Sequence, residues 1–186
     1  MPTKNPNPYP PDTTTYLNSS PVRSKIGSQR SWALTSDDVY DQFASTGDWM
    51  RSSLSDLEVV INAGVRTVLY NGDADYICNY MGFEAMVRAS CFLPLLLVFA
   101  LTLTLHAKID SLDTKFSPEF AKQNFSSFTV EGKPAGLYKN AGTFSYLRVT
   151  GAGHQVPAYL WRGVPRGAAA LQMFTQIMSD KPLSGT

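Results

Sequence analysis

The chain has little of several features that mark particular protein classes. Its 186 residues include only two cysteines, Cys78 and Cys91, and neither has a CxxC or Cys/His spacing that suggests zinc. One disulfide is possible in principle, but two cysteines do not make a disulfide framework. The 16 basic and 15 acidic residues leave a net charge of +1, without a basic run dense enough to bind phosphates. We therefore expect no metal, no cofactor and no nucleic acid partner.

The N-terminal segment lacks what a secretory signal peptide needs. It contains no apolar central region and is interrupted by prolines. We expect residues 1–15 to be extended or disordered. Read alone, this start suggests a cytosolic protein, and it equally fits an arbitrary start within a longer protein. Glycosylation triplets begin at Asn18 and Asn124, but such triplets are common by chance.

One long uncharged run does not fit an otherwise ordinary globular composition. Between Arg88 and Lys108 the sequence ASCFLPLLLVFALTLTLHA carries no formal charge unless His106 is protonated. A membrane helix needs roughly 20 apolar residues and a buried core helix uses about 10–14, so this run, with Pro94 inside it, fits neither length well. Three interpretations are open: a core helix, a membrane span, or a segment outside the folded design, such as translated intron sequence.

The pattern before this run is that of an α/β fold. Ser36 or Asp37 marks a helix start, and apolar residues at helical spacing continue to Trp49. A second helix is predicted over 53–62 and ends at the Ala-Gly pair that follows. The strand VRTVLY comes next, over 65–70. A helix, a glycine, an apolar strand and a loop in this order are typical of a parallel α/β sheet.

The C-terminal part has a different pattern. Apolar segments separated by glycines predict a β-meander or hairpin over 125–150. A closing helix is predicted over 163–178, with Leu171, Phe174 and Met178 on its buried side.

Two acidic residues directly follow the predicted strand 65–70. In NGDADY, Asp73 and Asp75 lie just beyond the C-terminal end of the strand, at the edge of an open α/β sheet where reactive groups gather. The plainer interpretation is a turn, because Asn-Gly-Asp favours turns. Later in the chain, VTGAGHQVP leads through small residues to His154, one of two histidines. A carboxylate can hold a histidine in one tautomer, and Asp before His is the chain order of α/β-hydrolases.

These segments carry a resemblance to a known family. YNGDADYICNYMG resembles the acid-bearing segment of serine carboxypeptidases, and VTGAGHQVP resembles their histidine segment. AALQMFTQIM is similar to the helix that follows the histidine. TYLNSSPVRSKIG and GDWMRSSLSDLEVVINAGVRTVLY are similar to segments that precede the acid. The resemblance covers most of the chain, with two specific motifs and three supporting ones.

The resemblance implies the C-terminal part of an α/β-hydrolase fold, a partial mixed sheet with flanking helices, over residues 16–186. It implies that Asp75 is the catalytic acid, that His154 is the general base, and that Cys78 lines the substrate pocket. Gln155 stands where several members carry Met or Glu, on the leaving-group side of the site. LWRGVPRGA departs from the short acidic or proline link usual in the family.

The resemblance also favours one interpretation of the apolar run. In the family, a sequence like GFEAMV is followed within a few residues by a sequence like DSLDTKFSPEF. Here the apolar block separates the two, as if it had been inserted at about 88–109. We therefore favour a segment that is not part of the folded design.

The nucleophile is missing from this sequence. The family's serine lies in a GxSxG elbow, usually GESYAG, well before the acid, and the chain contains no Gly-x-Ser-x-Gly. A His–Asp pair alone has nothing to activate. The resemblance thus implies a serine-type carboxypeptidase acting on peptide C-termini in a vacuole, a lysosome or outside the cell, with this chain inactive alone. Alternatives are a non-catalytic product of a truncated or wrongly delimited gene and a membrane-tethered accessory protein.

Overall fold

A computed structural model of the chain describes residues 13–88 and 112–186. The described residues divide at Ser53 into a smaller N-terminal unit and a larger unit that contains the sheet. Each unit is described by itself.

The smaller unit is helical. The helix predicted from Ser36 or Asp37 is present with Ser36 as its cap, since the Ser36 hydroxyl accepts a hydrogen bond from the Val39 N–H at 3.5 Å. The helix does not continue to Trp49, because Gly47 takes a left-handed φ of 70° and starts a separate 3₁₀ turn. The elements are α1 (Thr13–Asn18), α2 (Ser20–Ile26), α3 (Asp37–Ser45) and η1 (Asp48–Met50).

Two sequence expectations bear on the start of this unit. Residues 13–15, expected to be extended, belong to helix α1, and the rest of the predicted segment 1–15 lies outside the described residues. The side chain of Asn18, in the first glycosylation triplet, is hydrogen-bonded to the backbone of Trp32 through both its nitrogen (2.9 Å) and its oxygen (2.7 Å). That amide nitrogen is therefore already engaged within the unit.

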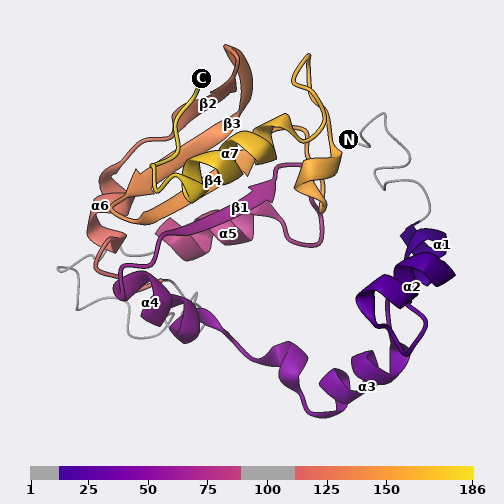
Figure 1. The fold of residues 1–186 in the computed structure, drawn as a ribbon. Coiled ribbons are helices and arrows are strands. Elements are labelled where there is room, and N and C mark those ends of the chain that lie inside the picture. The colour runs from indigo at the N-terminus through magenta and orange to yellow at the C-terminus, as the bar shows by residue number, and fades with distance from the viewer. Residues whose placement is uncertain (1–12, 89–111) are drawn as a thin grey trace. The chain divides into compact units, whose positions relative to one another are not determined.

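The larger unit is built on a mixed four-stranded sheet in the order β1-β4-β3-β2 (Figure 1). β1 and β4 are parallel, and the other two pairs are antiparallel. The predicted meander over 125–150 is confirmed. The strand predicted over 65–70 is β1, which begins and ends two residues later than predicted. The strands are β1 (Thr67–Gly72), β2 (Ser126–Val130), β3 (Lys133–Ala141) and β4 (Phe144–Val149).

Helices cover both faces of this sheet. Successive side chains of β4 point to opposite faces and are mostly apolar on both, so both faces need a covering layer. Tyr146 and Phe144 pack on one face against the helices α4 (Leu54–Asn62), α5 (Tyr80–Arg88) and α6 (Ser117–Lys122). Leu147 and Val149 pack on the other face against α7 (Ala168–Met178). The predicted α/β class, a partial mixed sheet with flanking helices, is thus observed.

The predicted buried side of the closing helix is wrong. Leu171, Phe174 and Met178 are 66%, 58% and 69% exposed, whereas Ala169 and Met173 are buried against the sheet. In AAALQMFTQIM the polar residues Gln172, Thr175 and Gln176 form one stripe and the remaining arc is apolar and wide, so the periodicity alone does not select the part of that arc that meets the sheet. The helix also begins at residue 168 rather than 163, because Gly163 and Gly167 have positive φ values in the segment before it.

The apolar run predicted to be an insertion at about 88–109 falls outside the described residues apart from Arg88, the last residue of α5. Its flanks nevertheless meet, because the Leu112 N–H donates to the Met86 carbonyl oxygen at 3.0 Å. Within the described parts of the chain, no helix has the length and apolar character needed to cross a membrane.

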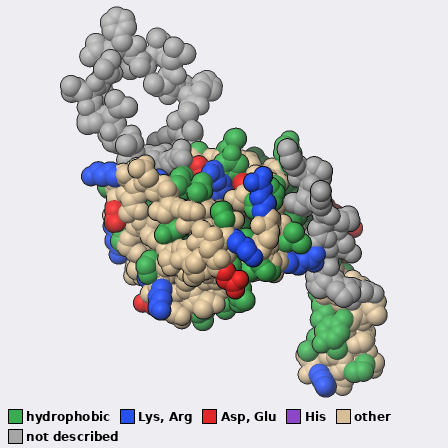
Figure 2. Space-filling view, turned by 90° about the horizontal axis from the view of Figure 1, so that it is seen from above, with side chains coloured by type: hydrophobic (Ala, Val, Ile, Leu, Met, Phe, Trp, Pro, Cys, Tyr) green, Lys and Arg blue, Asp and Glu red, His purple; other side chains and the backbone are tan. Residues whose placement is uncertain are grey.

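The surface agrees with the balanced composition. On the face of the molecule seen in Figure 2, basic and acidic side chains of the described residues are interspersed, with apolar side chains between them. This distribution fits the net charge of +1.

Candidate active site

Parallel pairing of β1 and β4 brings the two candidate motifs together. The register pairs Thr67 with Phe144 and continues to Gly72 with Val149, so both strands end at the same edge of the sheet. The acid loop (residues 73–78) leaves β1 there, and the histidine loop (residues 150–154) leaves β4 beside it. The edge expected from the sequence is therefore the edge that the structure uses.

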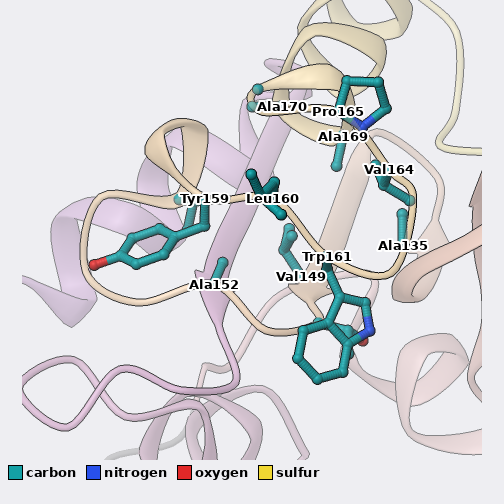
Figure 3. Close-up of a pocket in the computed structure, with 13 residues that line it drawn as sticks. Ala135, Val149, Ala152, Tyr159, Leu160, Trp161, Val164, Pro165, Ala169 and Ala170 are labelled. Carbon is teal, nitrogen blue, oxygen red and sulfur yellow. The ribbon is translucent and has the colours of Figure 1, made fainter. Parts of the chain in front are cut away.

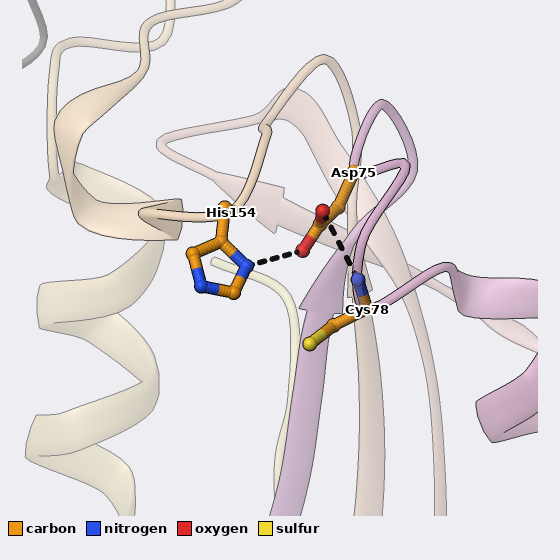
Figure 4. A group of neighbouring side chains, drawn as sticks. All are labelled: Asp75, Cys78 and His154. Carbon is orange, nitrogen blue, oxygen red and sulfur yellow. Dashed lines mark hydrogen bonds and ion pairs between the residues drawn. The ribbon is translucent and has the colours of Figure 1, made fainter. Parts of the chain in front are cut away.

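Asp75 and His154 are in direct contact at this edge. Nδ1 of His154 lies 3.0 Å from Oδ2 of Asp75, which confirms that the two side chains meet (Figure 4). The Asp75 side chain is only 5% exposed, whereas that of His154 is 56% exposed. The second ring nitrogen of His154 points away from Asp75 in this view. The acid is thus enclosed while the free face of the imidazole is open to a reactant.

The acid loop holds the Asp75 carboxylate ionised. Its Oδ1 accepts hydrogen bonds from the backbone N–H groups of Ile77 (2.9 Å) and Cys78 (3.2 Å). Burial opposes ionisation of Asp75, but the hydrogen bond with His154 and these two backbone bonds outweigh it, so the pKa of Asp75 lies below its ordinary value. An ionised carboxylate only accepts, so Nδ1 of His154 donates and Nε2 is left as the acceptor of the neutral ring.

Cys78 and Gln155, the other predicted site residues, lie next to this pair. The Cys78 thiol is half-buried, and one ligand atom each from Asp75, Cys78 and His154 lie within 4.8 Å of one another. Zinc accepts oxygen, nitrogen and sulfur ligands, so this set could hold a metal. Both Asp75 oxygens already accept hydrogen bonds, however. The arrangement is therefore that of an acid–base pair with a thiol next to it. Gln155 follows His154, and its carbonyl accepts from the Ala158 N–H at 2.7 Å at the start of η2 (Val156–Ala158).

A small cavity lies behind the histidine loop, between β4, η2 and the start of α7 (Figure 3). Its volume of about 10 Å³ is near the lower limit for holding a single water molecule, so it is not a substrate pocket. Among its lining residues, Tyr159 and Trp161 lie against the glycines of the loop: a Cβ added at Gly153 would meet the Tyr159 ring, and one at Gly151 would meet the Trp161 indole. The segment LWRGVPRGA therefore supports the histidine loop through Trp161.

Sequence reasoning did not assign a role to Asp73 beyond its place in the same motif. Its Oδ1 accepts a hydrogen bond from the Gly151 N–H at 2.7 Å, joining the acid loop to the histidine loop. The signal available in the sequence was the first acid of the Gly-Asp-x-Asp pattern, which a turn explains equally well.

The lowered pKa of Asp75 predicts a specific pH dependence of stability. The folded chain binds fewer protons at Asp75 than the unfolded chain, whose carboxyl titrates near 3.8. The stabilisation is therefore complete above about pH 5 and is lost as the pH falls through 3.8 and then through the lower folded value. Asp75→Asn removes this contribution. Urea unfolding of both proteins between pH 6 and pH 3 should show a steeper loss of unfolding free energy in the unmodified chain, and parallel curves would contradict the assignment.

Comparison with known proteins identifies the relatives of this chain. The profile of the family described as serine carboxypeptidase matches residues 2–180. Carboxypeptidase S1 of Penicillium janthinellum is 34% identical over 181 residues, which are 97% of this chain and 36% of that protein. Carboxypeptidase Y of Schizosaccharomyces pombe is 33% identical over 143 residues, covering 76% of this chain and 12% of that protein. Serine carboxypeptidase-like 47 of Arabidopsis thaliana is 29% identical over 167 residues, covering 89% and 27%.

These matches cover only part of each relative. It spans between 12% and 36% of the length of these three relatives, and the part that it matches is their C-terminal portion. The sheet with helices on both faces agrees with the match over residues 2–180. The chain belongs to the serine carboxypeptidase family.

Proposed function

We propose that this chain supplies the general base and its orienting acid to a serine-type carboxypeptidase, and that the nucleophilic serine comes from polypeptide outside this sequence. The observation that carries the proposal is the contact between Nδ1 of His154 and the buried carboxylate of Asp75 at 3.0 Å. A histidine held in this way presents Nε2 as a base toward the open side of the site.

The two residues have distinct roles in the proposed reaction. Nε2 of His154 takes the proton of the serine hydroxyl as its oxygen attacks the carbonyl carbon of the last peptide bond. His154 then gives that proton to the leaving amine, and the C-terminal residue departs while an acyl-enzyme forms. A water molecule, deprotonated by the same nitrogen, hydrolyses the acyl-enzyme. Asp75 orients the ring and stabilises its charged form without taking the proton.

We also propose roles for the two residues next to the pair, a substrate class and a cellular location. Cys78 would line the pocket beside the scissile bond, and Gln155 would border the leaving residue. The substrate would be the C-terminus of a peptide or protein, and the reaction would need no cofactor. The complete enzyme would work in a vacuole, a lysosome or outside the cell.

The free edge of β1 supports a nucleophile that comes from outside this sequence. Within the described residues, β1 pairs with β4 alone. The Asp73 N–H donates to the Val149 carbonyl on the β4 side, so by strand alternation the backbone groups of Val68 and Tyr70 face the other edge. An unpaired parallel edge next to a half-assembled site is where additional strands would join.

The exposed face of α7 supports the same proposal. Leu171, Phe174 and Met178 form an apolar row along the helix, at positions that the sequence predicted to be buried. Contiguous exposed apolar side chains of this size are typical of surfaces that another polypeptide covers.

Fusing the N-terminal portion of the Penicillium carboxypeptidase S1 to this chain tests the proposal. The isolated chain is expected to leave a blocked dipeptide intact, because it has no serine elbow. The Penicillium portion would supply the serine, so the fusion is expected to release the C-terminal residue at a measurable rate. Release by the isolated chain that His154→Ala abolishes would contradict the need for an external serine. A folded fusion without activity would favour the second candidate, a non-catalytic product, which the missing Gly-x-Ser-x-Gly motif already suggests.

A further inference from the structure

We infer that Asp73 is a positioning residue for the histidine loop, and that it places His154 within reach of Asp75. The inference rests on the proposed function, since it concerns the same acid–base pair. Asp75 orients the imidazole ring by holding Nδ1. Asp73 acts one step earlier, because it holds the backbone from which that ring projects.

The contact between Asp73 and the histidine loop is short and directed. Oδ1 of Asp73 accepts the Gly151 N–H at 2.7 Å, across 78 residues of sequence. A hydrogen bond to a carboxylate is roughly twice as strong as one between neutral groups. The Asp73 side chain is partly buried, so water competes with this bond only in part.

The backbone on either side of this contact extends the parallel pairing into the loops. The Asp73 N–H donates to the Val149 carbonyl at 3.0 Å, and the Ala74 N–H donates to the Ala152 carbonyl at 2.9 Å. Gly72 permits this approach, since a Cβ there would collide with the Ala152 carbonyl oxygen. The loop that carries the base is therefore joined to the loop that carries the acid at successive residues.

The histidine loop depends on such external contacts because its own side chains are small. Gly151, Ala152 and Gly153 offer at most a methyl group for packing, and Gly151 has a left-handed φ of 71°. The Trp161 indole lies against Gly151 on the side that a Cβ would occupy, and the Asp73 carboxylate accepts the Gly151 N–H. Removal of the carboxylate would leave one side of the loop without its polar contact.

Nuclear magnetic resonance of the histidine ring tests this inference in the full chain. A ring N–H that donates to a carboxylate gives a downfield, exchange-protected proton signal, and His154→Ala identifies which signal belongs to His154. We expect this signal in the unmodified chain and in Asp73→Asn, whose side-chain oxygen still accepts the Gly151 N–H. We expect its loss in Asp73→Ala. A signal that persists unchanged in a folded Asp73→Ala chain would overturn the inference.

Two further variants separate the inference from the proposed function. Asp75→Asn should remove the signal whatever Asp73 does, and a signal that survives in Asp75→Asn would contradict the acid–base pair itself. Ile61→Val trims a buried side chain of α4, on the face of the sheet away from α7. This variant controls for a general loosening of the core and should keep the signal. Its loss there would overturn the specific role of Asp73.

A second substitution covers the case in which Asp73→Ala does not fold. Asp73→Glu keeps the charge but moves the acceptor oxygen by one methylene group. The His154 signal should weaken or move, and the Gly151 amide should exchange faster than in the unmodified chain. An unchanged His154 signal together with faster exchange at Gly151 would show that the loop contact does not position the base, and would overturn the inference.

Discussion

Replacing His154 by alanine in the fusion with the Penicillium N-terminal portion is expected to lower kcat by about 10⁴-fold or more. The serine then has no base to take its proton, and the leaving amine has no acid to protonate it. The effect should fall on kcat with little change in KM, because the imidazole acts on the reacting atoms rather than on substrate binding. Steady-state hydrolysis of a blocked dipeptide by the two purified fusions provides the measurement.

The same fusion allows the acid to be tested beside the base. Asp75→Asn keeps the size of the side chain but places an amide against Nδ1, so the ring loses the orientation that makes Nε2 the base, and a loss of about 10⁴-fold is expected. Asp113→Asn, an exposed acid elsewhere in the larger unit, is the matched control and should leave kcat unchanged. If His154→Ala retained a tenth or more of the activity, the assignment of the base would be wrong.

Replacing Leu147 by alanine is expected to cost about 2–5 kcal/mol of unfolding free energy, a large part of the roughly 5–15 kcal/mol of a typical domain. Leu147 is fully buried on β4, between the parallel partner β1 and the antiparallel partner β3. Truncation leaves a cavity under the strand from which the histidine loop departs. Urea unfolding followed by circular dichroism measures the difference from the unmodified chain.

The same substitution at Leu171 separates burial from residue type. Leu171 lies on the exposed row of α7 and is 66% accessible, so Leu171→Ala is expected to change the unfolding free energy by no more than about 0.5 kcal/mol. Equal losses at the two positions would mean that α7 meets the sheet through the face that the sequence pattern suggested.

Local elements were well predicted wherever the signal was local. The helix predicted over 53–62 is observed as Leu54–Asn62, because apolar spacing marks its body and a glycine follows its end. The meander is found because Glu131 and Gly132, both with positive φ, form the tight turn between β2 and β3. The buried face of α7 was predicted wrongly, since its polar residues occupy one stripe and leave a wide apolar arc that does not single out the face against the sheet.

The same distinction between local and non-local features holds for the candidate site. Asp75 and His154 could be singled out from the sequence as candidates, because the motifs that contain them are local patterns that resemble segments of serine carboxypeptidases. Their separation of 3.0 Å could not be predicted, because the two residues are 79 positions apart in the sequence and meet only when β1 and β4 pair in one register. The contact of Asp73 with Gly151 was hidden for the same reason.

The amino-acid sequence by itself determined which chemical groups are present, the order in which they follow one another, and the family they indicate. The tertiary structure places Asp75, the acid that the resemblance implied, against the imidazole, and it alone shows that Asp73 accepts a hydrogen bond from the loop that carries the histidine. The physical reason is that side-chain type is a property of one position, whereas distance and burial arise when strands remote along the chain align and exclude water from the groups between them.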